Sequence, residues 1–336
     1  MNEKIENLLK EDRKFPPSEH LVKNANAPSS WYDEANEDRL KFWQKQALTR
    51  ISWFKEPTEI LDDSNPPFFK WFKDGELNLS YNCLDRHLES DGDRIAFYWE
   101  GEPGDTQEIT YQDLYERVCK LSNALKKLGV EKGDRVAIYL GMTPEIVVSM
   151  LACARIGAVH SVVFGGFSSE ALADRINDAK AKTVITADGA WRRGDIVPLK
   201  NNVDGSLELT EYVENVIVVK RTEQEINMTD GRDHWYHDIT DKESSDCEPE
   251  VMNSEDMLYI LYTSGTTAKP KGIVHTQGGY LTGVTTTHHE VFDVKEDDIY
   301  WCAADCGWVT GHSYIVYGPL ANKATSVMYE GAPNAP

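Results

Sequence analysis

The sequence predicts an α/β protein with mainly parallel, layered sheets and helices on both faces. Three observations support this fold class. Helical and strand signals alternate from about residue 95 onward, the strand segments are almost continuously apolar, and helix-capping residues stand between them. Strands that are apolar on both sides are typical of parallel sheets covered by helices on each face.

The helices and strands can be placed in order from their caps and apolar runs. Residues 1–30 are polar, and residues 31–80 carry irregularly spaced aromatic side chains, so we expect an extended segment pinned by its rings to a larger body. Thr110, with Asp113 three residues later, predicts the start of a helix. The further elements are a helix to about Leu128, a strand at 134–140, a helix from Thr143 to about Ile156, a strand at 158–164, a helix from Ser168 or Ser169 to about Lys180, and strands at 183–187, 215–220, 257–262, 299–304 and 326–330.

Composition limits the class of protein. The chain has 336 residues, a length that suggests about two domains, and it is 40% hydrophobic and 27% charged, as globular proteins are. The net charge of −21 excludes a uniformly basic surface, so neither nucleic acid nor a membrane surface is an expected partner. Six scattered cysteines without a CxxC pair predict reduced thiols and a cytoplasmic location.

The most informative segment is YTSGTTAKPKG at residues 262–272, which follows a predicted buried strand. Its glycines, hydroxyls and lysines are the groups that wrap phosphate oxygens. Four or five hydrogen bonds to a charged group, at about 1.5–3 kcal/mol each, would hold a triphosphate against the negative background. The spacing is not that of a Walker A loop. The alternative is an ordinary polar hairpin.

Three other loops also follow predicted strands. They are FGGFS at 164–168, DGAWRRG at 188–194 and AADCGWVTGH at 303–312. Ligands of open α/β sheets bind at the carboxyl edge of the strands, so we expect the four loops to meet at one edge. Taken singly, the three are also compatible with a plain turn, a surface arginine pair and a core tryptophan. No convincing zinc pattern and no Gly-x-Ser-x-Gly elbow is present.

Four stretches together resemble a known family. They are WFKDGELNLSYNCLDRHL at 71–88, VFGGFSSEALADRI at 163–176, YTSGTTAKPKGIVHT at 262–276 and CAADCGWVTGHSYIVYGPLANKAT at 302–325. They are similar to the adenylate-forming (acyl-CoA synthetase) superfamily, and within it to the AMP-forming acetyl-CoA synthetases, also called acetate–CoA ligases. The resemblance runs from about residue 20 to the end of the chain. It implies that acetate attacks ATP to give acetyl-adenylate and diphosphate, and that coenzyme A then displaces AMP.

The resemblance also implies roles for individual residues. It assigns the ATP phosphates to Thr263, Ser264, Gly265, Thr266, Thr267, Lys269 and Lys271, with Thr266 and Lys271 as the catalytic pair. It assigns the acetate pocket to Trp308, Val309 and Thr310, and coenzyme A to Gly165, Gly166, Ser168, Arg192 and Arg193. Mg²⁺ is expected with ATP, without a metal site made of protein side chains.

The family pattern divides the chain into an N-terminal segment at 1–80 and an AMP-binding domain at 81–336 that is incomplete at its carboxyl end. The family's later adenine-binding segments and its mobile C-terminal domain are not in the sequence, so these 336 residues are expected to be an inactive N-terminal fragment. Ala268 replaces a glycine common in the superfamily, and Asp195 stands where some relatives have a basic residue. The alternatives are a synthetase for propionate or another short acid, and a non-catalytic nucleotide- or CoA-binding fragment. The sequence leaves the oligomeric state open.

Overall fold

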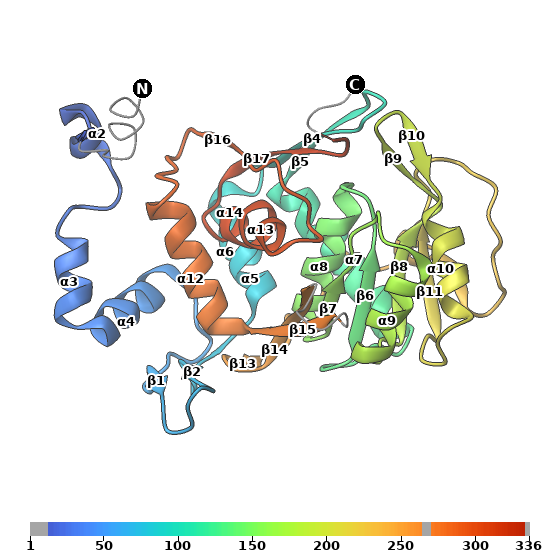
Figure 1. Ribbon diagram of the computed structural model, residues 1–336, viewed down its shortest axis with the longest axis horizontal. Helices are drawn as coiled ribbons and strands as arrows, with labels where there is room; N and C mark the ends of the chain where they lie inside the picture. Colours follow the sequence, from blue (N-terminus) through green and yellow to red (C-terminus); the bar gives the residue numbers. More distant parts are fainter. Residues whose placement is uncertain (1–12, 264–269, 333–336) are drawn as a thin grey trace, which may run out of the picture.

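The computed structural model describes residues 13–263 and 270–332, and it confirms the predicted α/β class. Its main body is a seven-stranded sheet of order β12-β11-β8-β6-β7-β14-β15, in which every neighbouring pair is parallel except β14 and β15 (Figure 1). The predicted strands of this sheet are confirmed. The bounds are β6 Arg135–Tyr139, β7 Val159–Val162, β8 Thr183–Ala187, β11 Asn215–Val219, β12 Asp233–Trp235, β14 Met257–Thr263 and β15 Lys271–Thr276.

Helices cover this sheet in two groups. Helices α7, α8 and α11 form one group, and α9 and α10 form the other. The crossover through α8 runs from β6 to β7, whereas that through α9 runs back from β7 to β8, so right-handed connections place the two groups on opposite faces. The predicted capping box of Thr110 and Asp113 and the predicted cap at Ser168 are both confirmed. The bounds are α7 Tyr111–Lys127, α8 Pro144–Arg155, α9 Ser169–Ala179, α10 Leu199–Leu207 and α11 Tyr236–Thr240.

A second sheet of four strands, β16-β17-β4-β5, lies beside the first and was not predicted as a separate layer (Figure 1). Its strand β16 ends at Trp301, earlier than the expected residue 304, because the chain turns away into the 303–312 loop. A run of helices packs next to this sheet. The bounds are β4 Ile95–Glu100, β5 Thr106–Thr110, β16 Ile299–Trp301, β17 Thr325–Tyr329, α12 Gln277–Glu290, α13 Val309–Gly311, the π-helix η1 His312–Tyr317 and α14 Gly318–Ala321.

The expectation of an extended segment at 31–80 is wrong in part, because this stretch contains helices. Trp31 packs edge-on against Phe42, with 5.1 Å between ring centroids, so some of the rings join α3 to α4 rather than to the main body. The bounds are α2 Glu19–Asn24, α3 Trp31–Glu37, α4 Arg39–Arg50, α5 Leu79–Cys83, α6 Asp85–Asp91, β1 Leu61–Asp62, β2 Lys70–Trp71, β3 Glu76–Leu77, β9 Ala190–Arg192, β10 Asp195–Val197 and β13 Met252–Asn253.

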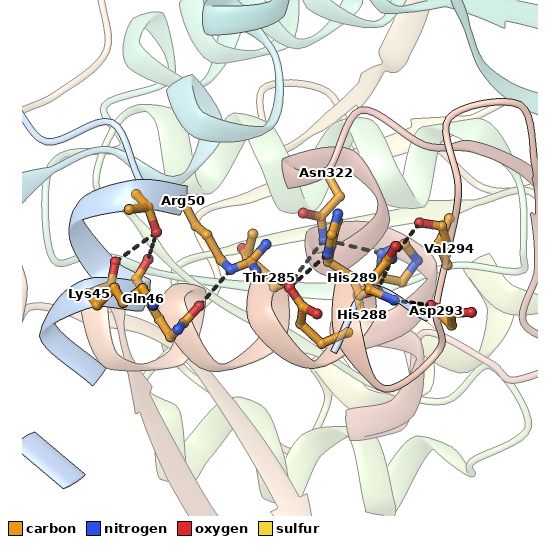
Figure 2. Close-up of polar contacts among 12 residues, drawn as sticks. Lys45, Gln46, Arg50, Thr285, His288, His289, Asp293, Val294 and Asn322 are labelled. Carbon is orange, nitrogen blue, oxygen red and sulfur yellow. Dashed lines mark hydrogen bonds and ion pairs between the residues drawn. The ribbon is translucent and has the colours of Figure 1, made fainter. Parts of the chain in front are cut away.

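The N-terminal helices are attached along α12. Arg50 forms an ion pair with Glu290, whose side chain is 4% exposed, and donates a second hydrogen bond to Gln46 (Figure 2). At the other end of α12, rings of the N-terminal segment lie on two glycines. A Cβ on Gly278 would stand 3.0 Å from the Trp53 ring, and one on Gly279 would stand 3.2 Å from Trp71 Cβ. A side chain at either position would force these neighbours to shift, and a Cβ on Gly278 would also clash with Ser254 Oγ.

Asn78 joins the N-terminal segment to the end of α8. Its buried side-chain amide donates to the carbonyl oxygens of Ala154, Arg155 and Glu250 at 2.9–3.0 Å. The first two carbonyls are at the carboxyl end of α8, where no intrahelical donor is available. One amide group therefore contacts three carbonyl oxygens, of which that of Arg155 also accepts from the backbone N–H of Glu250.

We expect Asn78→Ala to lower the free energy of unfolding by about 3 kcal/mol, because the buried Ala154 carbonyl loses its donor and the backbone N–H of Tyr81 loses its side-chain cap. The matched control is Asn123→Ala, since Asn123 also donates to two carbonyl groups but does so at the surface. It should lower stability by less than about 1 kcal/mol. Urea unfolding of both variants measures the difference, and equal losses would contradict this reading of Asn78.

Candidate functional site

Three of the four predicted loops lie at the carboxyl edge of the seven-stranded sheet, where β7, β8 and β14 end. The fourth loop was expected at the same edge, and this expectation is wrong. Residues 303–312 follow β16, which belongs to the smaller sheet. The fourth loop nevertheless reaches the site by direct contact. A Cβ on Gly307 would stand 2.9 Å from Phe164 Cα, so the two loops touch along their backbones.

The phosphate-type loop is described only at its two ends. Thr263 pairs with Lys271 where β14 and β15 close the hairpin, and both residues are exposed. Tyr262 holds the first end, because its hydroxyl donates to Asp178 Oδ2 of α9 at 2.7 Å. The predicted site residues Ser264, Gly265, Thr266, Thr267 and Lys269 lie outside the described residues.

The side chain of Tyr139 contacts the backbone of the 164–168 loop. The Tyr139 hydroxyl lies 3.0 Å from the carbonyl oxygen of Gly165 and 2.7 Å from that of Phe167, and it accepts a hydrogen bond from Asn202 at 3.1 Å. Burial raises the pKa of Tyr139, so the hydroxyl keeps its proton and remains a donor. The loop between β7 and α9 is therefore fixed by a side chain of β6.

Arg192 and Arg193 form the end and the turn of the β9–β10 hairpin. The Arg192 guanidinium lies over the Phe164 ring, 4.8 Å from its centroid. Arg193 has a φ of 55°, and its backbone N–H donates to Glu102 Oε2 at 2.9 Å, while the N–H of Gly194 donates to the other oxygen of the same carboxylate. Glu102, in the turn between β4 and β5, thus ties the second sheet to the arginine hairpin.

A cavity of ≈ 330 Å³ opens where these elements meet. Arg192, Trp308 and Thr310 line it, and Phe164 and Asp305 line it as well. The pKa of Asp305 is raised, because the effect of burial exceeds the opposite effects of the hydrogen bond from the Gly307 N–H and of the positive charge of Arg192. Val309 is outside the lining and 45% exposed, and Gly165, Gly166, Ser168 and Arg193 border the site without lining the cavity.

Sequence reasoning missed the residues that hold the loops together. Phe164 lies between Arg192 and Trp308, with 6.2 Å between the Phe164 and Trp308 ring centroids. An aromatic residue directly before paired glycines was the available signal for it. Glu102 and Tyr139 gave no signal, because they act from distant strands. Within residues 13–263 and 270–332, no group of three or more His, Cys, Asp or Glu side chains is placed to hold a metal.

Comparison with known proteins places the chain in a family. Residues 84–336 match the family described as AMP-binding enzyme, and residues 29–83 match the family described as acetyl-coenzyme A synthetase N-terminus. The chain belongs to the AMP-binding enzyme family. The resemblance on which the sequence analysis relied is thereby confirmed.

Curated relatives match along nearly all of the chain. An acetyl-coenzyme A synthetase of Streptomyces avermitilis is 61% identical over 337 residues, and one of Streptomyces coelicolor is 59% identical; each alignment covers 100% of this chain and 52% of the relative. One of Mycolicibacterium smegmatis is 55% identical, with 96% and 34% covered. The chain spans about half the length of the first two relatives. Over the described part of the chain, no helix has the length and apolar character needed to cross a membrane.

We expect Tyr139→Phe to loosen the 164–168 loop, because the variant keeps the ring and loses the hydroxyl that contacts two carbonyl oxygens. Amide hydrogen exchange in this loop should accelerate by about tenfold, which corresponds to one hydrogen bond. Tyr111→Phe is the matched control, since the buried Tyr111 hydroxyl donates to Ala324, away from the loop. Equal exchange in the loop of both variants would contradict the role given to Tyr139.

Proposed function

We propose that the natural protein carrying this chain is an AMP-forming acetate–CoA ligase. It converts ATP, acetate and coenzyme A into acetyl-CoA, AMP and diphosphate through an acetyl-adenylate. The observation that carries the proposal is the meeting of the arginine hairpin, the Phe164 loop and the Trp308 loop around one cavity. The names of relatives that are 61% and 59% identical over the whole chain support it.

The adenylation step needs positioning and charge neutralisation more than a nucleophilic side chain. Acetate carries its own nucleophilic oxygen, which attacks the α-phosphorus while the bond to diphosphate breaks. In this proposal the hairpin loop supplies the neutralising groups: hydroxyls and backbone N–H groups at 263–267, with Lys269 and Lys271. Thr266 and Lys271 are the two residues that we assign to the reacting phosphates.

The acyl group is assigned to the wall formed by Trp308 and Thr310. A tryptophan face beside a small cavity suits a short apolar acyl chain, and one methylene changes selectivity by only about 1–3 kcal/mol. Propionate is therefore the natural competitor. Val309 stays in the proposal because its backbone lies between Trp308 and Thr310, although its side chain does not line the cavity.

Coenzyme A is assigned to the edge formed by the 164–168 loop and the arginine hairpin. A guanidinium that occupies one face of an aromatic ring can still present its N–H groups to a phosphate. Arg192 lines the cavity and Arg193 does not, which makes Arg192 the main phosphate ligand in this proposal. Gly165, Gly166 and Ser168 allow the backbone to approach the same ligand.

Mg²⁺ enters this proposal as part of the ATP substrate. Phosphate oxygens and water supply most ligands of such an ion, with one or two protein oxygens. The hydroxyl-rich sequence at 263–267 supports that arrangement. We further propose the division into residues 1–80 and 81–336, and a cytoplasmic location, for which the six free cysteines are the support.

Replacement of Thr266 and Lys271 by alanine in the natural protein should reduce acetate-dependent ATP–diphosphate exchange by at least about 100-fold, because charge stabilisation at the reacting phosphates is lost. Lys220→Ala is the control, since Lys220 follows β11 at the same edge of the sheet but five strands away from β15. Exchange at the parent rate in the double variant would refute the assignment. Exchange that prefers propionate would move the proposal to a different short-chain acid.

Arg192→Ala should raise the KM for coenzyme A by about tenfold or more and leave acetate-dependent diphosphate exchange close to the parent rate, because the two steps use different ligands. Arg193→Ala, one residue along the same turn, should change the KM for coenzyme A less. A loss of exchange in Arg192→Ala would place this arginine at ATP instead. A larger effect in Arg193→Ala would reverse the order of the two arginines.

A further inference from the structure

The wall residue Trp308 has little side-chain packing to fix it. Its indole is 55% exposed, and its ring contact with Phe164 is tilted, with 6.2 Å between centroids. Neighbouring side chains restrict such a ring little, so the rotamers that it can adopt depend mainly on the backbone dihedral angles at its own residue. The position of this wall is therefore set by whatever fixes the Trp308 main chain.

His312 holds that main chain with two hydrogen bonds. The backbone N–H of His312 donates to the Trp308 carbonyl oxygen at 3.2 Å, and the ring atom Nδ1 lies 3.0 Å from the same oxygen. A carbonyl oxygen only accepts, so Nδ1 carries the proton. The His312 ring is fully buried, unlike the indole that it restrains.

The same ring rests on the two strands that lead into the other loops. It lies 4.4 Å from the Tyr259 ring of β14 and is stacked at 5.8 Å and 9° on His160 of β7. Tyr259 and His160 are register partners in the seven-stranded sheet. His312 thus contacts the strands that precede the phosphate-type loop and the 164–168 loop, while it bonds the start of the acyl wall.

Packing alone does not explain a histidine here. Burial lowers the pKa of His312 to about 4, so the ring is neutral near pH 7 and its single proton is used on Nδ1. Nε2 is then a buried acceptor, and no donor for it is found within the described residues. A buried acceptor without a donor costs free energy, and leucine or phenylalanine would fill the same space without that cost. The hydrogen bond from Nδ1–H is therefore the feature that a histidine adds at this position.

We propose that His312 is a positioning residue that, through its bond to the Trp308 carbonyl, sets the acyl wall at a fixed place relative to β7 and β14. The identity of the acid rests on the proposed function, whereas the restraint on Trp308 does not. His312 touches no reacting atom in this proposal. It acts on the selectivity for short acids, because a wall that moves no longer distinguishes acetate from a longer chain.

The test compares three substitutions in the natural protein labelled with 5-fluorotryptophan. His312→Asn keeps an N–H near the position of Nδ1, His312→Gln moves the amide to the position of Nε2, and His312→Leu removes the donor. The control is His288→Leu, since His288 is equally buried but its ring forms a hydrogen bond with Asn322 (Figure 2). The ¹⁹F resonance of Trp308, identified by its loss in Trp308→Phe, reports the wall without any turnover.

We expect a single sharp Trp308 resonance in the parent, His312→Asn and His288→Leu, and a shifted or broadened one in His312→Gln and His312→Leu. In the last two, the KM for acetate should rise roughly tenfold, as for one lost hydrogen bond, with a smaller change in kcat and a weaker preference over propionate. The asparagine variant should stay close to the parent in both respects.

An unchanged Trp308 resonance in His312→Leu, or the same changes in His288→Leu, would overturn the proposal. If His312→Leu does not fold, the contrast between the asparagine and glutamine variants decides, and equal behaviour of these two would overturn it. If the parent protein does not use acetate, the proposed function fails, and the ¹⁹F comparison still decides whether His312 restrains Trp308.

Discussion

Parallel pairing of β7 with β14 is the constraint on which the site depends. Tyr259 stands opposite His160 in this register, so the loops that follow the two strands leave the sheet side by side. A crossover cannot be short between parallel strands, and here almost a hundred residues separate β7 from β14. Those residues build β8, β11, β12 and the arginine hairpin, which returns to the same edge. The pairing therefore brings distant parts of the chain to one place.

The site carries positively charged side chains although the chain as a whole is strongly negative. The chain carries −21, and yet Arg192 faces the cavity and Lys271 stands at the base of the hairpin loop. Three nearby carboxylates are bonded to groups other than these two cations. Glu102 is engaged by backbone N–H groups, and Glu330 and Asp105 are paired with Arg221. These three acidic residues thus serve as structural partners, whereas Asp305, which also lines the cavity, interacts with the charge of Arg192.

Sequence reasoning succeeded where the signal is local. The capping box of Thr110 and Asp113 and the apolar strands are set by neighbouring residues, and so they were predicted. Helix α12 gave no such signal, because its sequence QGGYLTGVTTTHHE is rich in glycine and threonine, and tertiary packing has to stabilise it. The second sheet depends on β17 pairing with β4, more than 200 residues away. The same division applies to the site: its loops were predicted, but Phe164, Tyr139 and Glu102, which fix their relative positions, act across the fold.

The contact of Trp53 and Trp71 with Gly278 and Gly279 joins the N-terminal segment to the first turn of α12. Because α12 begins directly after β15, any displacement of that turn is passed to the strand that carries Lys271. A methyl group on Gly279 would press on Trp71 Cβ, and one on Gly278 would press on both Trp53 and Ser254 Oγ. A smaller ring would relieve neither contact, so we expect both glycines to be kept in natural sequences that keep this N-terminal segment.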